Sequence, residues 1–189
     1  MNVARVLYPV KVLGPGKRIG IWVTGCKRGC KGCSNPELWE QRPECEVSVT
    51  DLYDLICRLA DLHHVDGFTI SGGEPMLQAE ELLKLVNQIR LISDDILVYT
   101  GFQIEELRDS RDTSVVSLLA SIAVLIDGPY IEELNDNTVL RGSSNQRVHI
   151  LNKDYQDMYS LYLKTSHNQI QNFSTSDGIV SVGIHHPSF

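Results

Sequence analysis

The alternation of short apolar runs with helical segments is the feature that most constrains the fold of this chain. Runs rich in β-branched residues predict four strands, at residues 19–24, 67–71, 96–100 and 122–126. Helical periodicity predicts helices between them, at residues 52–59, 77–93, 103–109 and 114–121. Thr50 or Asp51 is expected to cap the first helix. Strands that alternate with helices pair in parallel through crossover connections, so the sequence predicts an α/β fold.

A chemically distinctive turn follows each predicted strand. Three cysteines come after the first strand, and residues 72–74, Gly-Gly-Glu, come after the second. Residues 99–101, Tyr-Thr-Gly, end the third strand, and residues 127–130, Asp-Gly-Pro-Tyr, follow the fourth. Functional groups in parallel α/β folds lie at the carboxyl ends of the strands. We therefore expect the four turns to meet at one edge of the sheet and to form one site.

The length of the chain limits how complete this fold can be. A closed eight-fold barrel takes about 250 residues, and this chain has 189. We therefore expect a partial barrel, open on one side, over residues 1–151. Residues 152–189 are expected to form an appendage on the same domain, a helix or mixed segment over 153–164 and then a β-hairpin that turns at residues 176–178.

Composition favours a cytoplasmic protein. The chain has no run of eighteen apolar residues, so no membrane span is expected. Its first twelve residues lack the pattern of a signal peptide. Five cysteines, an odd number, argue against a secreted disulfide framework. A net charge of −7 disfavours nucleic acid as a main partner.

Charge is distributed unevenly along the chain. Residues 1–35 contain seven of the 17 basic residues and none of the 24 acidic ones, so this part carries +7 and the remainder −14. The basic part includes the cysteines, where positive charge would favour reduction of a metal cluster and would attract an acidic electron donor. The alternative is an ordinary solvated basic loop.

The three cysteines are the candidate metal ligands. Cys26, Cys30 and Cys33 have C-x3-C-x2-C spacing in a glycine-rich loop, and thiolates are soft ligands for iron or zinc. Three thiolates on a cubane 4Fe-4S cluster would leave one iron open for an exchangeable ligand. The alternative is a structural zinc site completed by Cys45 or a histidine. Otherwise Cys45 and Cys57 are expected to be free thiols, with no auxiliary cluster.

This cysteine spacing resembles the signature of the radical S-adenosylmethionine (SAM) superfamily. Residues 30–39, Cys-Lys-Gly-Cys-Ser-Asn-Pro-Glu-Leu-Trp, resemble one subgroup, the activating enzymes of anaerobic ribonucleotide reductase. Residues 72–74, 127–129 and 141–147 add to the resemblance, which extends over residues 12–151. One departure is Gly32, which stands where the superfamily often has an aromatic residue. The fold implied is the partial, open (βα) barrel of the radical SAM type, with the hairpin as an extension.

The resemblance implies a radical SAM oxidoreductase. Such an enzyme cleaves S-adenosyl-L-methionine reductively at a 4Fe-4S cluster and forms a 5′-deoxyadenosyl radical, so no catalytic side chain is expected. The radical would take a hydrogen atom from a glycine of a glycyl radical enzyme, such as anaerobic ribonucleotide reductase. The implied electron donor is a low-potential protein such as flavodoxin or ferredoxin. The alternatives are a radical SAM enzyme that modifies a peptide or small metabolite, and a non-catalytic metal-binding module.

The resemblance also implies a set of cofactor-binding residues. Cys26, Cys30 and Cys33 would ligate the cluster, and the residues expected to contact SAM are Gly32, Ser34, Gly72, Gly73, Glu74, Thr100, Asp127 and Arg141. Glu74 would accept from the SAM amino group or brace its turn. Asp127 would bind ribose hydroxyls or a cation, or form a turn or cap. Arg141 would clamp the SAM carboxylate, meet the partner, or form surface ion pairs. His185 and His186 are expected to be surface residues.

Overall fold

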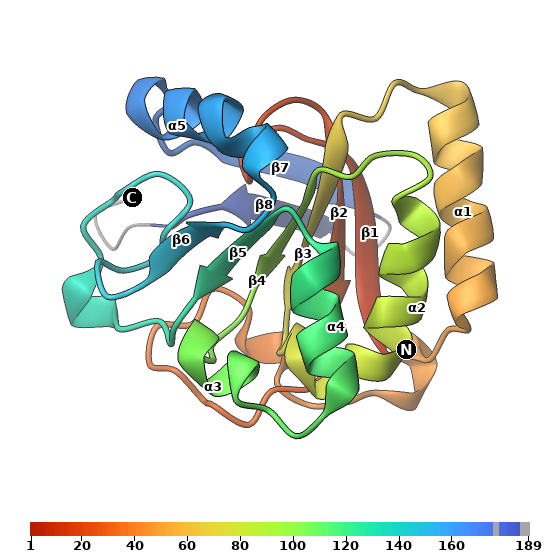
Figure 1. The fold of residues 1–189 in the computed structure, drawn as a ribbon, viewed down its shortest axis with the longest axis horizontal. Coiled ribbons are helices and arrows are strands. Elements are labelled where there is room, and N and C mark those ends of the chain that lie inside the picture. Colours follow the sequence, from red (N-terminus) through yellow and green to blue (C-terminus); the bar gives the residue numbers. More distant parts are fainter. Residues whose placement is uncertain (176–177, 186–189) are drawn as a thin grey trace.

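A six-stranded, mostly parallel sheet forms the centre of the computed structural model, which describes residues 1–175 and 178–185 (Figure 1). The strands lie in sequential order and β2 to β5 are parallel. They are β1 (Val3–Val10), β2 (Arg18–Val23), β3 (Gly67–Gly72), β4 (Ile96–Tyr99), β5 (Val124–Asp127) and β6 (Arg147–Ile150). The predicted α/β class is confirmed.

The two edge strands of the sheet are antiparallel to their neighbours. The sequence predicted parallel pairing of the four strands between residues 19 and 126, which is confirmed for β2 to β5. It predicted no strand before residue 19, so β1 is a strand that the prediction missed. All but one of the β1 residues are only half-buried, and Pro9 interrupts the pattern. Proline is compatible with an edge strand, which pairs on one side only. The apolar signal of a buried strand is therefore absent from this segment.

Helices α1 (Val49–Leu62), α2 (Ala79–Ile89) and α4 (Thr113–Ser121) cover one face of the sheet (Figure 1). The predicted cap of α1 was wrong: Ser48 is the capping residue, and its side chain accepts from the Asp51 N–H. The segment before α2 is a short 3-10 helix, Pro75–Gln78, so α2 begins later than predicted. The short helix α3 (Ile104–Arg108) lies where β4 ends.

Side chains of one strand alternate between two cores. Ile96 and Val98 of β4 pack toward the helices, in a cluster that includes Phe68, Leu82 and Leu118. Leu97, between them, faces a second cluster with Tyr159 of α5 (Gln156–Thr165). This alternation follows from the two-residue period of a strand. Both faces of the sheet are therefore covered, although only one carries the main helices.

A buried ion pair fixes α5 at the end of the sheet away from the cysteines. The Arg18 guanidinium donates to the Asp95 carboxylate and to Thr69 Oγ1, at 2.5 and 2.7 Å, and is fully buried. The Tyr159 hydroxyl donates to the same carboxylate at 2.6 Å. A buried charge needs such partners to offset its desolvation. The network ties the start of β2 to the appendage helix.

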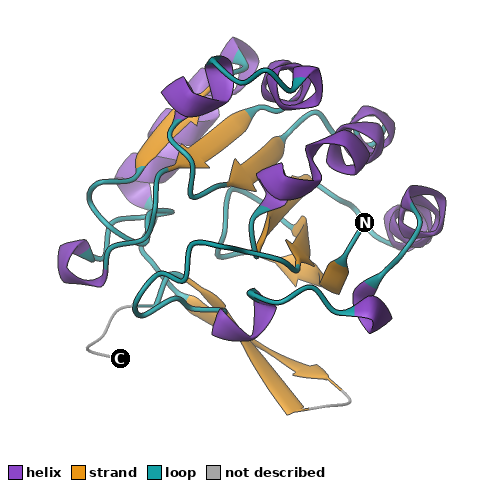
Figure 2. Cartoon of the chain, turned by 90° about the horizontal axis from the view of Figure 1, so that it is seen from below, coloured by secondary structure: helices purple, strands orange, loops and turns teal. Residues whose placement is uncertain are grey.

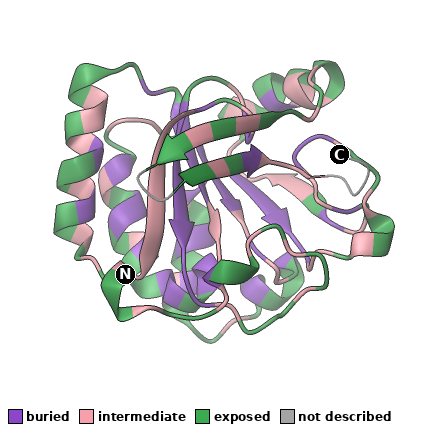
Figure 3. Ribbon diagram, turned by 180° about the vertical axis from the view of Figure 1, so that it is seen from behind, coloured by how far each residue is buried: buried purple, intermediate pink, exposed green. Residues whose placement is uncertain are grey.

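The C-terminal hairpin is a separate two-stranded sheet, β7 (Ile170–Thr175) and β8 (Gly178–Gly183). It matches the predicted hairpin, whose turn residues Ser176 and Asp177 lie outside the described residues, as does His186. The hairpin crosses the sheet on the face away from α1, α2 and α4 (Figure 3). Seen from below, it extends past the body of the sheet (Figure 2).

In the described part of the chain, none of the helices has the length and apolar character that crossing a bilayer would require.

Candidate cofactor site

The cysteine loop follows directly from β2 and is held at its base by backbone hydrogen bonds. Gly25 N–H donates to the Leu38 carbonyl at 2.9 Å, and Cys26 N–H donates to the Trp39 carbonyl at 2.8 Å. Beyond this base the chain turns tightly, and Gly29 and Gly32 adopt positive φ angles of 58° and 70°. Glycine takes this conformation without steric cost. The loop therefore curls so that its three thiols border one pocket.

One pocket brings together most of the residues predicted for the site. Its lining residues come from the segments that follow β2 to β5, and these strands end at the lower edge of the sheet in Figure 1. The predicted residues that line it are Cys26, Cys30, Cys33, Ser34, Gly72, Gly73, Glu74 and Thr100. All four predicted turns therefore meet at this edge, the fourth through Gly128 and Tyr130, while Asp127 itself lies off the pocket.

Gly72 and Gly73 are required by the close approach of β3 to the cysteine loop. A Cβ on Gly72 would lie 2.4 Å from the Val23 carbonyl oxygen, and one on Gly73 would lie 2.6 Å from the Gly25 carbonyl oxygen. Gly72 also has a positive φ of 106°. The following N–H groups, of Gly73 and Glu74, donate to those same two carbonyls. The two glycines thus join the second turn to the loop that carries the cysteines.

Glu74 braces the turns that follow β3 and β4. Its carboxylate is buried and accepts from the Thr100 hydroxyl and the Gly101 N–H, each at 2.8 Å, and from the Met76 N–H at 3.1 Å. Burial raises the pKa of this carboxyl, and the three donors and Arg28 oppose the rise. These contacts correspond to the bracing role among the two roles predicted for Glu74.

Arg28 is a site residue whose contacts the sequence did not predict. Its guanidinium lies over the Phe102 ring, 4.4 Å from the centroid, and its Nε is 3.8 Å from the Glu74 carboxylate. Arg28 therefore connects the cysteine loop to the end of β4. Only the charge of Arg28 was evident from the sequence, because a cation–π contact between residues so distant along the chain leaves no local pattern.

Asp127 lies beside the pocket and holds two elements together. Its carboxylate accepts from the Ile104 N–H at the start of α3, at 2.8 Å, and from Arg147 on β6, at 2.6 Å. Burial alone would raise the pKa of Asp127, but these donors and the nearby His149 keep the pKa below its ordinary value. Asp127 is 1% exposed, and Gly128 and Tyr130 border the pocket in its place. These contacts tie the start of α3 to β6, and the predicted binding of ribose or a cation by Asp127 stays a prediction.

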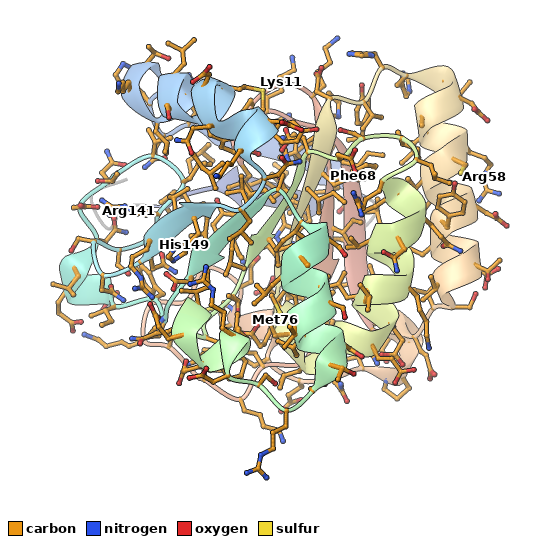
Figure 4. The ribbon with its side chains drawn as sticks, in the orientation of Figure 1. Lys11, Arg58, Phe68, Met76, Arg141 and His149 are labelled. Atoms are coloured by element: carbon orange, nitrogen blue, oxygen red, sulfur yellow. The ribbon has the colours of Figure 1, made fainter. Side chains whose placement is uncertain are left out.

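Arg141 and Gly32 also lie away from the pocket lining. Figure 4 shows Arg141 on the loop that leads into β6, and its guanidinium donates to the Gln146 carbonyl at 3.2 Å. Gln146 lines the pocket instead, and its amide donates to the Gly128 carbonyl at 2.9 Å. Gly32 packs against Glu132. The resemblance had marked the segment that contains Gln146 but had assigned its role to the arginine.

The donor set consists of three thiols, which are soft ligands that suit an iron–sulfur cluster. Cys26, Cys30 and Cys33 are free, half-buried thiols on one pocket. Over residues 1–175 and 178–185, no group of three or more Cys, His, Asp or Glu side chains is arranged to hold one metal ion. The pocket continues from the three thiols to Gly73 and Thr100, which leaves space beside a cluster for a further ligand.

Comparison with known proteins identifies the class. Residues 12–149 match the family described as "4Fe-4S single cluster domain". Among curated proteins, the chain is 36% identical over 154 residues to the anaerobic ribonucleoside-triphosphate reductase-activating protein of Salmonella typhi, covering 76% of this chain and 96% of that protein. The protein of that name from Escherichia coli K12 is 36% identical over 151 residues, with the same coverage. The one from Enterobacteria phage T4 is 33% identical over 153 residues, covering 78% of this chain and 93% of the phage protein.

These similarities extend over most of the chain and nearly all of each relative. The chain therefore belongs to the family of anaerobic ribonucleoside-triphosphate reductase-activating proteins, within the 4Fe-4S single cluster class. The resemblance noted in the sequence is confirmed, and so is the predicted 4Fe-4S cofactor.

Proposed function

We propose that this protein is a radical SAM enzyme that activates anaerobic ribonucleoside-triphosphate reductase by installing a glycyl radical on it. The observation that carries the proposal is one shared pocket. Its wall contains three free cysteines and the Gly72–Glu74 turn, in a member of the activating-protein family. A soft, three-thiolate ligand set beside an open binding space suits a cluster with one exchangeable site.

The residues of the pocket divide into two groups in this proposal. Cys26, Cys30 and Cys33 hold the cluster, and the residues that bind SAM along the rim are Ser34, Gly72, Gly73, Glu74 and Thr100. A cluster held by the three cysteines would supply the electron for reductive cleavage of SAM, and the rim residues would orient SAM so that the target glycine can give up its hydrogen atom. The protein supplies binding and orientation.

Three predicted residues act through the segments that they hold. Asp127 fixes α3 to β6, and Arg141 fixes the loop that presents Gln146 to the pocket. Gly32 lets the cysteine loop turn where a Cβ would meet Glu132. We propose that all three residues position the segments that line the SAM site without contacting SAM themselves.

The arrangement of the sheet supports a partial radical SAM barrel. Sequential parallel strands have helices on one face and the pocket at their carboxyl ends, as in a barrel cut open. We assign residues 1–151 to this unit and 152–189 to an appendage packed on it. An open barrel shields a carbon radical poorly, which favours a protein substrate that completes the enclosure.

The proposed partners and cellular location follow from the proposed radical chemistry. The partner is the reductase, and the electron donor is a low-potential protein such as flavodoxin or ferredoxin, attracted by the basic residues of the cysteine loop. A cytoplasmic location, where thiols stay reduced, is part of the proposal. Nucleic acid and membrane have no role in it.

Anaerobic reconstitution tests the proposal. The loaded protein should contain about four irons per chain, and with dithionite and SAM it should release 5′-deoxyadenosine. Added reductase should then show a glycyl radical in its electron paramagnetic resonance spectrum. Cys26→Ala, Cys30→Ala and Cys33→Ala should each abolish both products, and Cys45→Ala and Cys57→Ala are the controls. One bound zinc and no deoxyadenosine would exclude the enzyme. Deoxyadenosine without a glycyl radical would indicate another substrate.

A further inference from the structure

The C-terminal hairpin borders the reaction pocket although it lies beyond the matched family region. The family match ends at residue 149, whereas β7 begins at Ile170. Residues 181–185, on β8 and just after it, line the same pocket as the three cysteines. An element outside the shared domain therefore forms one wall of the site.

The hairpin is held in place by packing and by side-chain hydrogen bonds. Val182 is 3% exposed and packs with Val10, Leu13 and Trp22. The Gln171 amide accepts from the Lys11 N–H at 2.9 Å and donates to the Pro9 carbonyl at 2.7 Å, as a paired strand would.

At its other end, the Asn135 amide donates to the His185 carbonyl at 2.7 Å. Isolated hairpins are marginally stable in water, so these anchors fix β8 before any partner arrives.

The register of the hairpin shows which backbone groups are unpaired. Thr175 and Gly178 are partners that enclose two residues, and such an enclosing pair is hydrogen-bonded. Alternate pairs along an antiparallel ladder point their N–H and C=O groups outward. The outward groups of β8 therefore belong to Ile179, Ser181 and Gly183. Among the described residues, no backbone hydrogen bond outside the hairpin involves them.

We propose that this open edge of β8 binds an extended segment of the protein partner as an added strand, and that this segment carries the target glycine. The proposal rests on the proposed function, because it needs a protein substrate. Ser181 and Gly183 lie in the cysteine pocket, so a strand paired with them passes its backbone through the reaction site.

Main-chain pairing gives affinity that depends little on side chains. This mode of binding suits a target glycine, because glycine has no side chain. Gly183 itself is required by the fold of the hairpin, because a Cβ there would lie 2.3 Å from the Gln169 carbonyl oxygen.

Hydrogen exchange of the full-length, reconstituted protein with the reductase tests the proposal without measuring activity. The amides of Ile179, Ser181 and Gly183 should exchange quickly in the free protein and slow at least tenfold in the complex. The amides of Val180 and Val182, which face β7, should be slow in both. Unchanged exchange at the three outward amides in a formed complex would overturn the proposal.

A matched pair of proline variants gives a second test. Ser181→Pro removes an outward N–H on β8, and Ser174→Pro removes one on the outer edge of β7, away from the pocket. Proline is tolerated at such unpaired edge positions. Ser181→Pro should weaken reductase binding about tenfold in interferometry, and Ser174→Pro less than about twofold.

Folding of both variants is checked by Trp22 fluorescence in a Trp39→Phe background, because Trp22 packs under the hairpin. Equal affinity of the two folded variants for the reductase would overturn the proposal that the partner adds a strand to β8. The proposed function would still stand if the wild-type protein installs the radical, and it would fail if the protein does not.

Discussion

At the scale of single residues, the site depends on a buried carboxylate rather than on an exposed catalytic group. Glu74 is 2% exposed and joins the turns after β3 and β4 through the Thr100 hydroxyl and the Gly101 N–H. Each carboxylate oxygen accepts at least one hydrogen bond from the protein. A buried acceptor whose donors are all paired fixes the relative position of the two turns, because the loss of any one hydrogen bond would leave a buried donor unpaired.

Replacing Glu74 by glutamine should therefore destabilise the protein although the size is conserved. The new NH2 group must face either the Gly101 N–H or the donors on the other oxygen. We expect a loss of about 1–3 kcal/mol in the free energy of unfolding, measured with urea on the cofactor-free chain. Glu80→Gln, on an exposed pair with Lys84, should change it by less than about 0.5 kcal/mol. Equal values for the two variants would contradict the bracing role.

At the scale of elements, one ion cluster connects α3, β5 and β6. Arg147 of β6 lies 2.6 Å from both the Asp127 carboxylate of β5 and the Glu105 carboxylate of α3. The Arg147 hydrogen bonds lower the pKa of Glu105 to about 2. Asp127 also has a lowered pKa, and His149 on β6 lies 3.1 Å from it (Figure 4). The edge of the sheet is thus fixed by charge rather than by apolar packing alone.

This cluster predicts a pH dependence of stability. Carboxyl groups whose pKa is lowered by folding stabilise the protein above their ordinary pKa range, and this contribution disappears as the pH falls toward 2. Arg147→Gln should cost about 1–3 kcal/mol at pH 7, because buried Asp127 loses a charged donor. The difference from wild type should shrink between pH 5 and pH 2.5. Arg90→Gln, which removes an exposed helix pair with Asp94, should show little effect at any pH in urea unfolding. If the difference in unfolding free energy between Arg147→Gln and wild type stayed constant with pH, the stabilising role of the ionised carboxylates would be contradicted.

At the scale of the whole molecule, charge is divided between residues 1–35, which include the cysteine loop, and the rest of the chain. Residues 1–35 carry +7 and the remainder −14. Some of this positive charge is used internally: Arg18 is buried with Asp95, and Lys31 pairs with Glu132 and Glu133. Lys27 lies exposed in the cysteine loop, and no ion pair is recorded for it in the described residues. We therefore expect Lys27 to contribute to steering of the proposed acidic electron donor.

Reversing this charge should slow electron delivery to the cluster. Lys27→Glu is expected to reduce the rate of cluster reduction by flavodoxin about three- to tenfold at low ionic strength, because steering toward the loop is lost. The difference should diminish in about 0.5 M salt. Stopped-flow bleaching of the cluster absorbance measures it, with Lys84→Glu on α2 as the control. Equal rates for the two variants at low salt would exclude steering through Lys27.

The sequence alone determined the features that are encoded locally. Strand and helix periodicity predicted β2 to β5 and the helices between them, because each pattern lies within one segment. The spacing of Cys26, Cys30 and Cys33 indicated the cluster, and the turns after the strands indicated the edge that holds the pocket. The hairpin was also predicted, from two apolar strands around a short turn.

Tertiary structure alone decided which groups face the pocket. Only the folded chain shows that Asp127 points to α3 and β6, that Glu74 braces two turns, and that β8 forms a wall of the site. It also shows that β1 is an antiparallel edge strand. The physical reason is range: these contacts join residues far apart in the chain, and their geometry depends on how the strands pack. A local pattern shows which residue types are present, but their direction is set by the whole fold.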